Sequence, residues 1–291
     1  RPVAVVTRGG TMSSAAAREG SRRALLALAT LASAGVVVYR ALGGAGGTVV
    51  SATCKGAPAL VLALVGVTAP AGANPRGKVF ANRVGVGLAL SALGDVVLES
   101  ANGFLPGLCF FLLAHLAYGA AFNVDTAAGQ RARLGTIKLW LGRLFILFWG
   151  ALLLAAFGFL RRGVPDELEY PVAAYVAVIG VMVYRAAARY EPSCGAESYL
   201  SAVIGAVFFA ASDFLLAYDR FIHHVDAARY LVLFLYYIGQ IGIANSTIFP
   251  DYKPPSTPAK RAEVPATTAK AKAASSTASA KSGKKGARKR R

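Results

Sequence analysis

The sequence contains few of the residues from which proteins build metal centres and disulfide frameworks. It has three cysteines and three histidines among 291 residues. Cys54, Cys109 and Cys194 lie far apart and form no C-x-x-C pair, which argues against a disulfide framework and a thiolate metal site. His223 and His224 are adjacent, and no H-x-x-x-H or H-E-x-x-H spacing occurs. We therefore expect no metal ion and no other cofactor.

Other absences narrow the function further. The chain has no G-x-S-x-G nucleophile elbow and no phosphate-binding glycine loop. Acidic residues are scarce, 14 against 32 Lys and Arg, which gives a formal net charge of +18. Residues 251–291 hold twelve of these basic residues and two of the acidic ones. Because the excess is concentrated in this tail, we expect no nucleic-acid partner.

Apolar residues, in contrast, are abundant. They make up 55% of the chain, charged residues make up 16%, and the mean hydropathy is +0.50, values typical of a multi-pass membrane protein. Most of the apolar segments approach the ~20 residues that a spanning helix needs. They lie at Ala24–Tyr39, Ala57–Ala71, Val79–Leu98, Phe104–Phe122, Ile137–Leu160, Tyr170–Ala188, Tyr199–Tyr218 and Ala228–Phe249. We predict an all-α fold, a polytopic membrane bundle of about eight transmembrane helices.

The predicted domain organisation has three parts. A short basic segment (1–23) precedes the eight-helix membrane domain (24–250), and a disordered basic tail (251–291) follows it. The first apolar run follows Arg22-Arg23 and also resembles a signal-peptide core, but we interpret it as a retained helix.

The basic residues also predict an orientation. An even number of helices puts both termini on one side, and the Lys/Arg bias makes that side cytosolic. An endomembrane such as the endoplasmic reticulum is the expected location. The tail is either a solvated segment or a site for anionic membrane lipids, and the sequence does not indicate an oligomeric state.

Two carboxylates stand inside apolar helices. Asp95 and Asp213 each lie late in a predicted helix, and by helix parity the two helices run in the same direction. The aspartates should therefore share one membrane depth. A carboxylate costs several kcal/mol at such a position, so it normally faces a protein interior or a wet cavity. The pair is our candidate functional centre.

The surroundings of the two aspartates also match. Each is preceded eight positions earlier by glycine, and Tyr118 and Tyr236 follow Asp95 and Asp213 by the same 23 residues. This pattern suggests a parallel internal repeat. Ser91 lies one turn before Asp95 on the same helical stripe.

Several neighbouring polar residues have a structural interpretation beside the functional one. His115, Tyr118 and Tyr237 could be buried packing residues, and Gln240 and Ser246 could join helices by hydrogen bonds.

At these positions the chain resembles the YhhN-type lysoplasmalogenase family of integral membrane hydrolases. The resemblance spans roughly Lys55 to Ser246. It rests on Lys55 with Pro58 opening the second helix, Gly94-Asp95, His115-x-x-Tyr118, Ser212-Asp213, Tyr236-Tyr237-x-x-Gln240 and Ser246. The chain departs from the family's Lys-Pro pair, because two residues separate Lys55 from Pro58 in the stretch Lys55-Gly-Ala-Pro58.

The resemblance implies hydrolysis of the vinyl ether bond of a lysoplasmalogen. The products would be a fatty aldehyde and glycerophosphoethanolamine or glycerophosphocholine. Protonation of a vinyl ether creates an oxocarbenium ion, so one carboxyl must donate a proton while an anion stabilises the cation, as in glycosidases. Asp95 and Asp213 would share these roles in either order, and Lys55 would support the anion or hold the phosphate.

The remaining candidates would orient water and the headgroup of the lysophospholipid substrate. They are Ser91, His115, Tyr118, Ser212, Tyr236, Tyr237, Gln240 and Ser246. Two rival functions stay open at this level: a proton-coupled secondary transporter and a non-catalytic lipid-binding membrane protein.

Overall fold

A computed structural model describes residues 9–42, 48–69, 75–124, 136–189 and 196–248. Eight α-helices and no strand occur in these ranges. The helices are α1 (Gly9–Ala41), α2 (Thr48–Val67), α3 (Pro75–Leu98), α4 (Phe104–Phe122), α5 (Thr136–Leu160), α6 (Asp166–Ala188), α7 (Ala196–Phe221) and α8 (Ala228–Asn245). The all-α prediction is confirmed. The predicted tail, residues 251–291, lies outside the described residues.

Six helices are long and apolar enough to cross a membrane, namely α1, α2, α3, α4, α6 and α7. The described apolar stretch of α5 is shorter, Leu147–Leu160. The remaining helix, α8, carries Arg229, Gln240 and Asn245, which lower its mean hydropathy. The chain is therefore an integral, multi-pass membrane protein.

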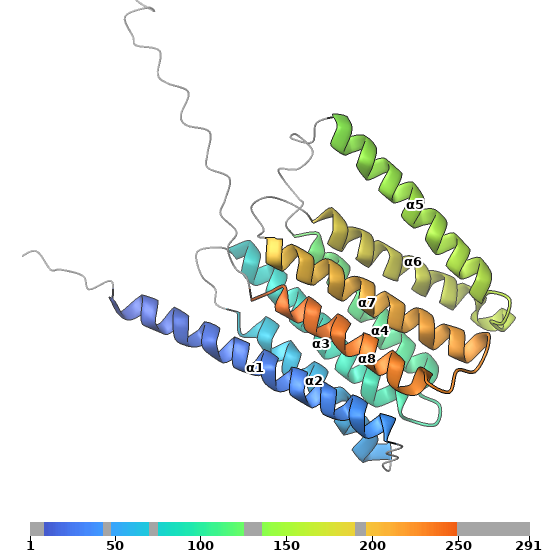
Figure 1. Ribbon diagram of the computed structural model, residues 1–291, viewed down its shortest axis with the longest axis horizontal. Helices are drawn as coiled ribbons and strands as arrows, with labels where there is room; N and C mark the ends of the chain where they lie inside the picture. Colours follow the sequence, from blue (N-terminus) through green and yellow to red (C-terminus); the bar gives the residue numbers. More distant parts are fainter. Residues whose placement is uncertain (1–8, 43–47, 70–74, 125–135, 190–195, 249–291) are drawn as a thin grey trace, which may run out of the picture. The chain divides into compact units, whose positions relative to one another are not determined.

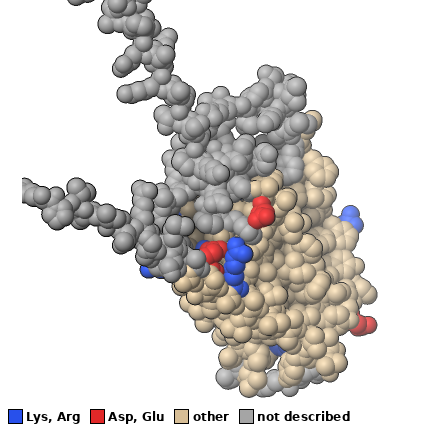
Figure 2. Space-filling view, turned by 60° about the vertical axis from the view of Figure 1, so that its left-hand side comes forward, with Lys and Arg blue, Asp and Glu red and all other residues tan. Residues whose placement is uncertain are grey.

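Large apolar side chains cover the outside of the bundle. Leu31, Leu147, Phe148 and Leu154 are each more than 60% exposed. Charged side chains form small, isolated groups on the face seen in Figure 2. A water-soluble protein rarely exposes apolar surface on this scale, whereas a lipid-facing surface must be apolar.

Neighbouring helices are packed as antiparallel pairs along most of the chain (Figure 1). The closest pairs are α7 with α8, α3 with α4, and α2 with α3, while α5 contacts only α6 and α7 among the described helices. Glycine permits the close contact of α7 with α8, because a Cβ atom on Gly205 would lie 2.6 Å from the backbone nitrogen of Ile243. Small residues allow this backbone approach in membranes.

The polar groups gather at one end of the bundle, where α3 and α7 end and α4 and α8 begin; we call this the site end. At the opposite end, buried Arg22 of α1 donates to the carbonyl oxygens of Val65 (2.9 Å) and Thr247 (2.8 Å). These bonds join the middle of α1 to the last turn of α2 and to the residues after α8. They satisfy carbonyls that the ends of those helices leave unpaired.

Two expected helix starts were wrong. The first helix begins at Gly9, well before Ala24, and the second begins at Thr48, before Ala57. Lys55 and Pro58 consequently lie inside α2 and do not open it. Before the first apolar run, the stretch Ala15-Ala-Ala-Arg-Glu19 consists of good helix formers, and proline is tolerated inside a membrane helix. The internal repeat stays a prediction.

Candidate active site

A charged cavity of about 190 Å³ lies at the site end, and it brings both intramembrane aspartates together. Its lining comes from six helices, α1, α2, α3, α4, α7 and α8, and from the residue after α3. The lining residues are Arg40, Lys55, Asp95, Leu98, Glu99, Phe111, Ser212, Asp213, Leu216, Asp219, Ala228, Arg229, Val232, Leu233 and Tyr236. Four carboxylates and three cations therefore border one small space.

Asp95 is almost completely buried, with 1% of its surface exposed. Tyr236 of α8 donates its hydroxyl hydrogen to Asp95 Oδ2 at 2.5 Å. On the other side, Lys55 Nζ lies 4.0 Å from Asp95 Oδ1. Burial of this carboxyl disfavours its charge, whereas the hydrogen bond and the nearby ammonium group both favour the ionised form.

Lys55 also belongs to a chain of charged side chains along the wall of the cavity. Its Nζ is 3.5 Å from Glu99 Oε1, and Glu99 Oε2 lies 3.2 Å from Arg40 Nη2 and 2.5 Å from Ser51 Oγ. Partial burial opposes ionisation of Glu99, but the Ser51 hydrogen bond and the charges of Lys55 and Arg40 outweigh it. They lower the pKa of Glu99 below its ordinary value of 4.5. Glu99 is thus an anion that holds both cations in place.

Asp213 has different neighbours. Tyr175 of α6 donates its hydroxyl hydrogen to Asp213 Oδ2 at 3.0 Å, and His115 Nε2 lies 3.2 Å from the same oxygen. The His115 ring is 1% exposed, and its Nδ1 lies 2.5 Å from the carbonyl oxygen of Phe111. Within the described part of the chain, Nε2 has no aligned hydrogen-bond partner.

The hydrogen on the His115 ring follows from these contacts. A carbonyl oxygen can only accept, so Nδ1 must carry a hydrogen, and in a neutral ring Nε2 then presents a lone pair. That lone pair would repel an ionised Asp213 carboxylate 3.2 Å away.

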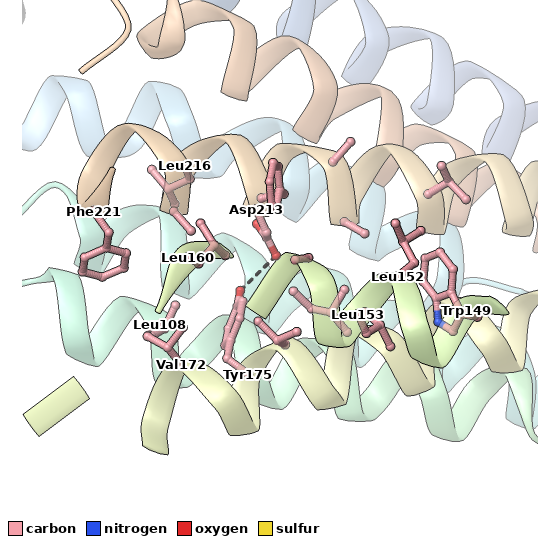
Figure 3. A pocket seen from close by; sticks show the side chains of 18 of the residues that line it. Leu108, Trp149, Leu152, Leu153, Leu160, Val172, Tyr175, Asp213, Leu216 and Phe221 are labelled. Atoms are coloured by element: carbon pink, nitrogen blue, oxygen red, sulfur yellow. Dashed lines mark hydrogen bonds between the residues drawn. The ribbon is translucent and has the colours of Figure 1, made fainter. Parts of the chain in front are cut away.

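A second cavity, the apolar cleft, lies between α4, α5, α6 and α7 and has a volume of about 460 Å³. Its lining is apolar except for Asp213, the Tyr175 hydroxyl and the indole nitrogen of Trp149, and Asp213 is its one charged member among the described residues. Figure 3 shows Asp213 and Tyr175 facing each other, between Trp149 toward one end of the cleft and Phe221 toward the other.

Asp213 lines both cavities, as does Leu216 one turn later. The apolar cleft and the charged cavity thus adjoin each other at α7. Asp95, in contrast, borders the charged cavity alone. The carboxyl of Asp213 therefore lies at the boundary between the apolar cleft and the charged cavity, and the carboxyl of Asp95 lies inside the charged cavity.

A polar network behind the cavity holds three more of the candidate residues. Tyr118 donates to Gln240 Oε1 at 2.8 Å, and its hydroxyl lies 3.2 Å from Ser91 Oγ. All three side chains are fully buried. The nitrogen of Gln240 has no hydrogen-bond partner among the described groups. This network joins α3, α4 and α8 but does not border either cavity.

Two candidates join helices near the site. Tyr237 donates to the carbonyl oxygen of Lys55 at 2.8 Å, and Ser212 donates to that of Val232 at 3.0 Å. Ser246 is elsewhere, because its hydroxyl bonds to the carbonyl of Ile243 at the end opposite the site. Residues near the end of α8 lie far along the helix axis from Tyr236, so Ser246 borders neither cavity, and its role in the site stays a prediction.

Sequence reasoning missed several site residues. Tyr175 gave no signal, because one tyrosine in an apolar helix is ordinary. Glu99 lies one turn beyond Asp95 but directly after the end of α3, where a charged residue is ordinary. Arg40 lies at the end of α1, where a basic residue is expected for other reasons. The apolar cleft, formed by α4, α5, α6 and α7, has no signature in the sequence. Among the described residues, no three His, Cys, Asp or Glu side chains form a group that could hold a metal ion.

The fold and the site define an integral membrane helix bundle with an intramembrane acidic centre. Residues 50–247 match the model of the YhhN family. The matched region covers more than half of the chain, and the chain belongs to this family. The resemblance inferred from the sequence is thereby confirmed.

Curated relatives share this region. The chain is 33% identical to "Lysoplasmalogenase TMEM86A" of Bos taurus over 172 residues, which is 58% of this chain and 66% of that protein. It is 30% identical to "Lysoplasmalogenase TMEM86B" of Homo sapiens over 161 residues, 55% of this chain and 61% of that protein. It is also 30% identical to "Lysoplasmalogenase" of Mycobacterium tuberculosis over 203 residues, 67% of this chain and 69% of that protein.

The chain spans less than two thirds of the length of the two TMEM86 relatives named above. No solved structure matches it significantly.

Proposed function

We propose that this protein hydrolyses the vinyl ether bond of lysoplasmalogens. The products are a fatty aldehyde and glycerophosphoethanolamine or glycerophosphocholine. One observation carries the proposal: Asp213 stands where the apolar cleft meets the charged cavity that also contains Asp95. The names of the relatives from Bos taurus, Homo sapiens and Mycobacterium tuberculosis agree with this activity.

The shape of the substrate fits the two adjoining cavities. A lysoplasmalogen has one long hydrocarbon chain and one charged headgroup, and its vinyl ether bond is at the boundary between them. In our proposal the hydrocarbon chain of the lipid occupies the apolar cleft, and the glycerophospho-base occupies the charged cavity. The scissile bond then lies beside Asp213, between the two carboxyl groups.

Asp213 acts as the proton donor in this scheme. The carbon that receives the proton is on the hydrocarbon side of the ether oxygen. Asp213 is the carboxyl that borders the apolar cleft, where the hydrocarbon chain lies in this scheme. The position of His115 supports the same assignment, because its Nε2 lies 3.2 Å from Asp213 Oδ2, within reach for proton exchange with that carboxyl. Tyr175 fixes the carboxyl by its hydrogen bond.

Asp95 supplies the negative charge and later acts as a base. Protonation of the carbon turns the ether into an oxocarbenium ion, which the ionised Asp95 stabilises electrostatically. Water adds to the cationic carbon and passes one proton to Asp95, giving a hemiacetal. Collapse of the hemiacetal returns the hydroxyl proton to Asp213, while the proton on Asp95 moves to the departing glycerol oxygen. Both carboxyls regain their starting states.

The test is a hydrolysis assay with purified protein in detergent. The wild type should release aldehyde from a lysoplasmalogen and should leave the matching acyl lysophospholipid intact. Asp95→Asn and Asp213→Asn should each lower kcat by at least 100-fold, the lower range for loss of an acid or base group. Asp226→Asn is the matched control, because Asp226 lies at the site end but is fully exposed.

Each other result has a defined meaning. The paired-acid mechanism would be excluded if Asp95→Asn or Asp213→Asn cleaved the lysoplasmalogen as fast as the wild type. The variant must retain the wild-type melting temperature for this conclusion. Cleavage of the acyl lipid alone would indicate an esterase. Binding without any product would favour the lipid-binding alternative, and proton-dependent uptake into vesicles of an unaltered solute would favour the transporter.

We also propose that both termini face the cytosol and that the protein resides in an endomembrane such as the endoplasmic reticulum. The Lys/Arg bias of the loops and of residues 251–291 supports this orientation, and a tail so placed could bind anionic lipids. Protease added outside sealed microsomes should remove an epitope tag at the C-terminus. Protection of the tag would reverse the orientation.

A further inference from the structure

Arg229 is the charged residue of the cavity that has no protein partner among the described residues. It lies in the first turn of α8, lines the charged cavity, and is exposed. Val232, Leu233 and Tyr236 line the same cavity and follow it at helical spacings of three, four and seven residues. Arg229 therefore stands on the same face of α8 as Tyr236, roughly 10 Å along the helix axis from it.

The other two cations of the cavity are already engaged. Arg40 lies 3.2 Å from Glu99 and also contacts Ser51. Lys55 lies 3.5 Å from Glu99 and 4.0 Å from Asp95. If Arg40 or Lys55 moved to bind a substrate, a carboxylate would lose its counter-charge. An unpaired carboxylate costs free energy in a partly buried site.

The carboxylates near the start of α8 do not engage Arg229 either. Asp219 accepts a hydrogen bond from the backbone nitrogen of Val225 (2.8 Å), and its Oδ1 lies 3.1 Å from His224 Nδ1. Asp213 is paired with Tyr175 and His115. Among the described residues, Arg229 is therefore the one cation of the cavity without an ion-pair partner, and its position in the first turn of α8 is the proposed headgroup end of the cavity.

We propose that Arg229 binds the phosphodiester of the lysophospholipid headgroup. This inference rests on the proposed function. A guanidinium group binds a phosphate through two parallel hydrogen bonds and stays charged at every working pH. The glycerol carbons separate the ether oxygen from the phosphate, so a bond held near Asp213 and Tyr236 places the phosphate farther along α8, toward its first turn. Lys55 then acts on Asp95 and Glu99, not on the phosphate.

The consequence is a preference for substrates that carry a phosphate. The experiment compares kcat/KM for a lysoplasmalogen with kcat/KM for a 1-O-alkenylglycerol, which has the same vinyl ether and chain but no phosphate. Arg229→Gln should lower the ratio of the two values roughly tenfold or more, the size expected for loss of a charge-assisted hydrogen bond. The loss should be in KM, and Arg229→Lys should retain part of the preference.

Arg162→Gln is the matched control. Arg162 is also an exposed arginine at the site end, but it does not line either cavity. This variant should keep the wild-type ratio. That result would show that loss of one positive charge from the site end does not by itself lower the ratio. An unchanged ratio in Arg229→Gln, or a loss of the same size in Arg162→Gln, would overturn the assignment.

A separate measurement keeps this inference apart from the proposed function. A 1-O-alkyl lysophospholipid has the same headgroup but no vinyl ether, so its binding to the purified protein does not depend on hydrolysis. Arg229→Gln should raise its Kd roughly tenfold and leave the Kd of the 1-O-alkylglycerol unchanged. If the wild type shows no hydrolysis but this difference is found, the proposed activity fails and the phosphate site stands. Equal binding of the headgroup lipid by both proteins would exclude the site.

Discussion

The hydroxyl group of Tyr236 offers a sensitive test of the role of Asp95. It donates a hydrogen bond of 2.5 Å to a carboxyl that is almost completely buried. Tyr236→Phe removes this one atom and keeps the ring, which packs edge to face against Phe111 and Phe209 with centroids 6.0 and 5.3 Å away. The change therefore isolates the hydrogen bond from the packing.

The expected loss can be estimated from the kind of bond. A hydrogen bond to a charged group contributes about 1.5–3 kcal/mol, and each 1.36 kcal/mol changes a rate tenfold. If Asp95 must be ionised and correctly placed for the reaction, kcat should fall between about 10- and 150-fold. KM should change little, because the tyrosine hydroxyl acts on the carboxyl and not on the bound lipid.

Tyr237→Phe is the natural control for this variant. Tyr237 is the next residue of α8 and is equally buried, but its hydroxyl donates to the backbone carbonyl of Lys55 at 2.8 Å. Loss of a neutral hydrogen bond costs about 1 kcal/mol, which should appear in thermal stability more than in kcat. Steady-state aldehyde release by the two variants decides the matter. If Tyr236→Phe kept wild-type kcat, or lost no more than Tyr237→Phe, Asp95 would not be the anion that we propose.

Two further predictions concern the bundle and the charge chain. Gly205→Ala should destabilise the protein by about 1–3 kcal/mol, because its Cβ would lie 2.6 Å from a backbone nitrogen of α8. Gly158→Ala, which meets open space, should not lower the melting temperature in detergent, and equal effects of the two changes would contradict the close packing of α7 and α8. Glu99 has a lowered pKa, so its ion pairs should stabilise the protein fully above pH 4.5 and lose this effect as the pH falls through the lower, folded-state pKa. The difference in melting temperature between the wild type and Glu99→Gln should therefore shrink in acid, and a difference that grows there would refute this interpretation.

Most of the site residues that the sequence analysis found share one property: they are polar in helices that are otherwise apolar. Asp95, Asp213 and Gln240 are conspicuous for this reason, since burial of such groups in a membrane is costly. Their order along the chain also carried the family resemblance. The residues that were missed lacked this contrast, as with Tyr175, or lay at helix ends where charge is ordinary, as with Arg40 and Arg229.

The sequence by itself determined the class of the protein. Its composition required a membrane, the lengths of its apolar runs predicted the eight helices, and a few polar residues at matching depths identified the two carboxyls. Each of these properties is local to one helix or depends only on helix parity, so no knowledge of packing was needed.

Only the tertiary structure decided which faces of the helices meet. A membrane helix is apolar on its lipid side and on its packed side, so periodicity does not show which face turns inward. The pairing of Asp213 with Tyr175 and His115, the position of Asp213 on two adjoining cavities, and the lone charge of Arg229 all depend on that rotation. The division of labour that we propose between Asp95 and Asp213 follows from these contacts between distant helices, which no single stretch of sequence contains.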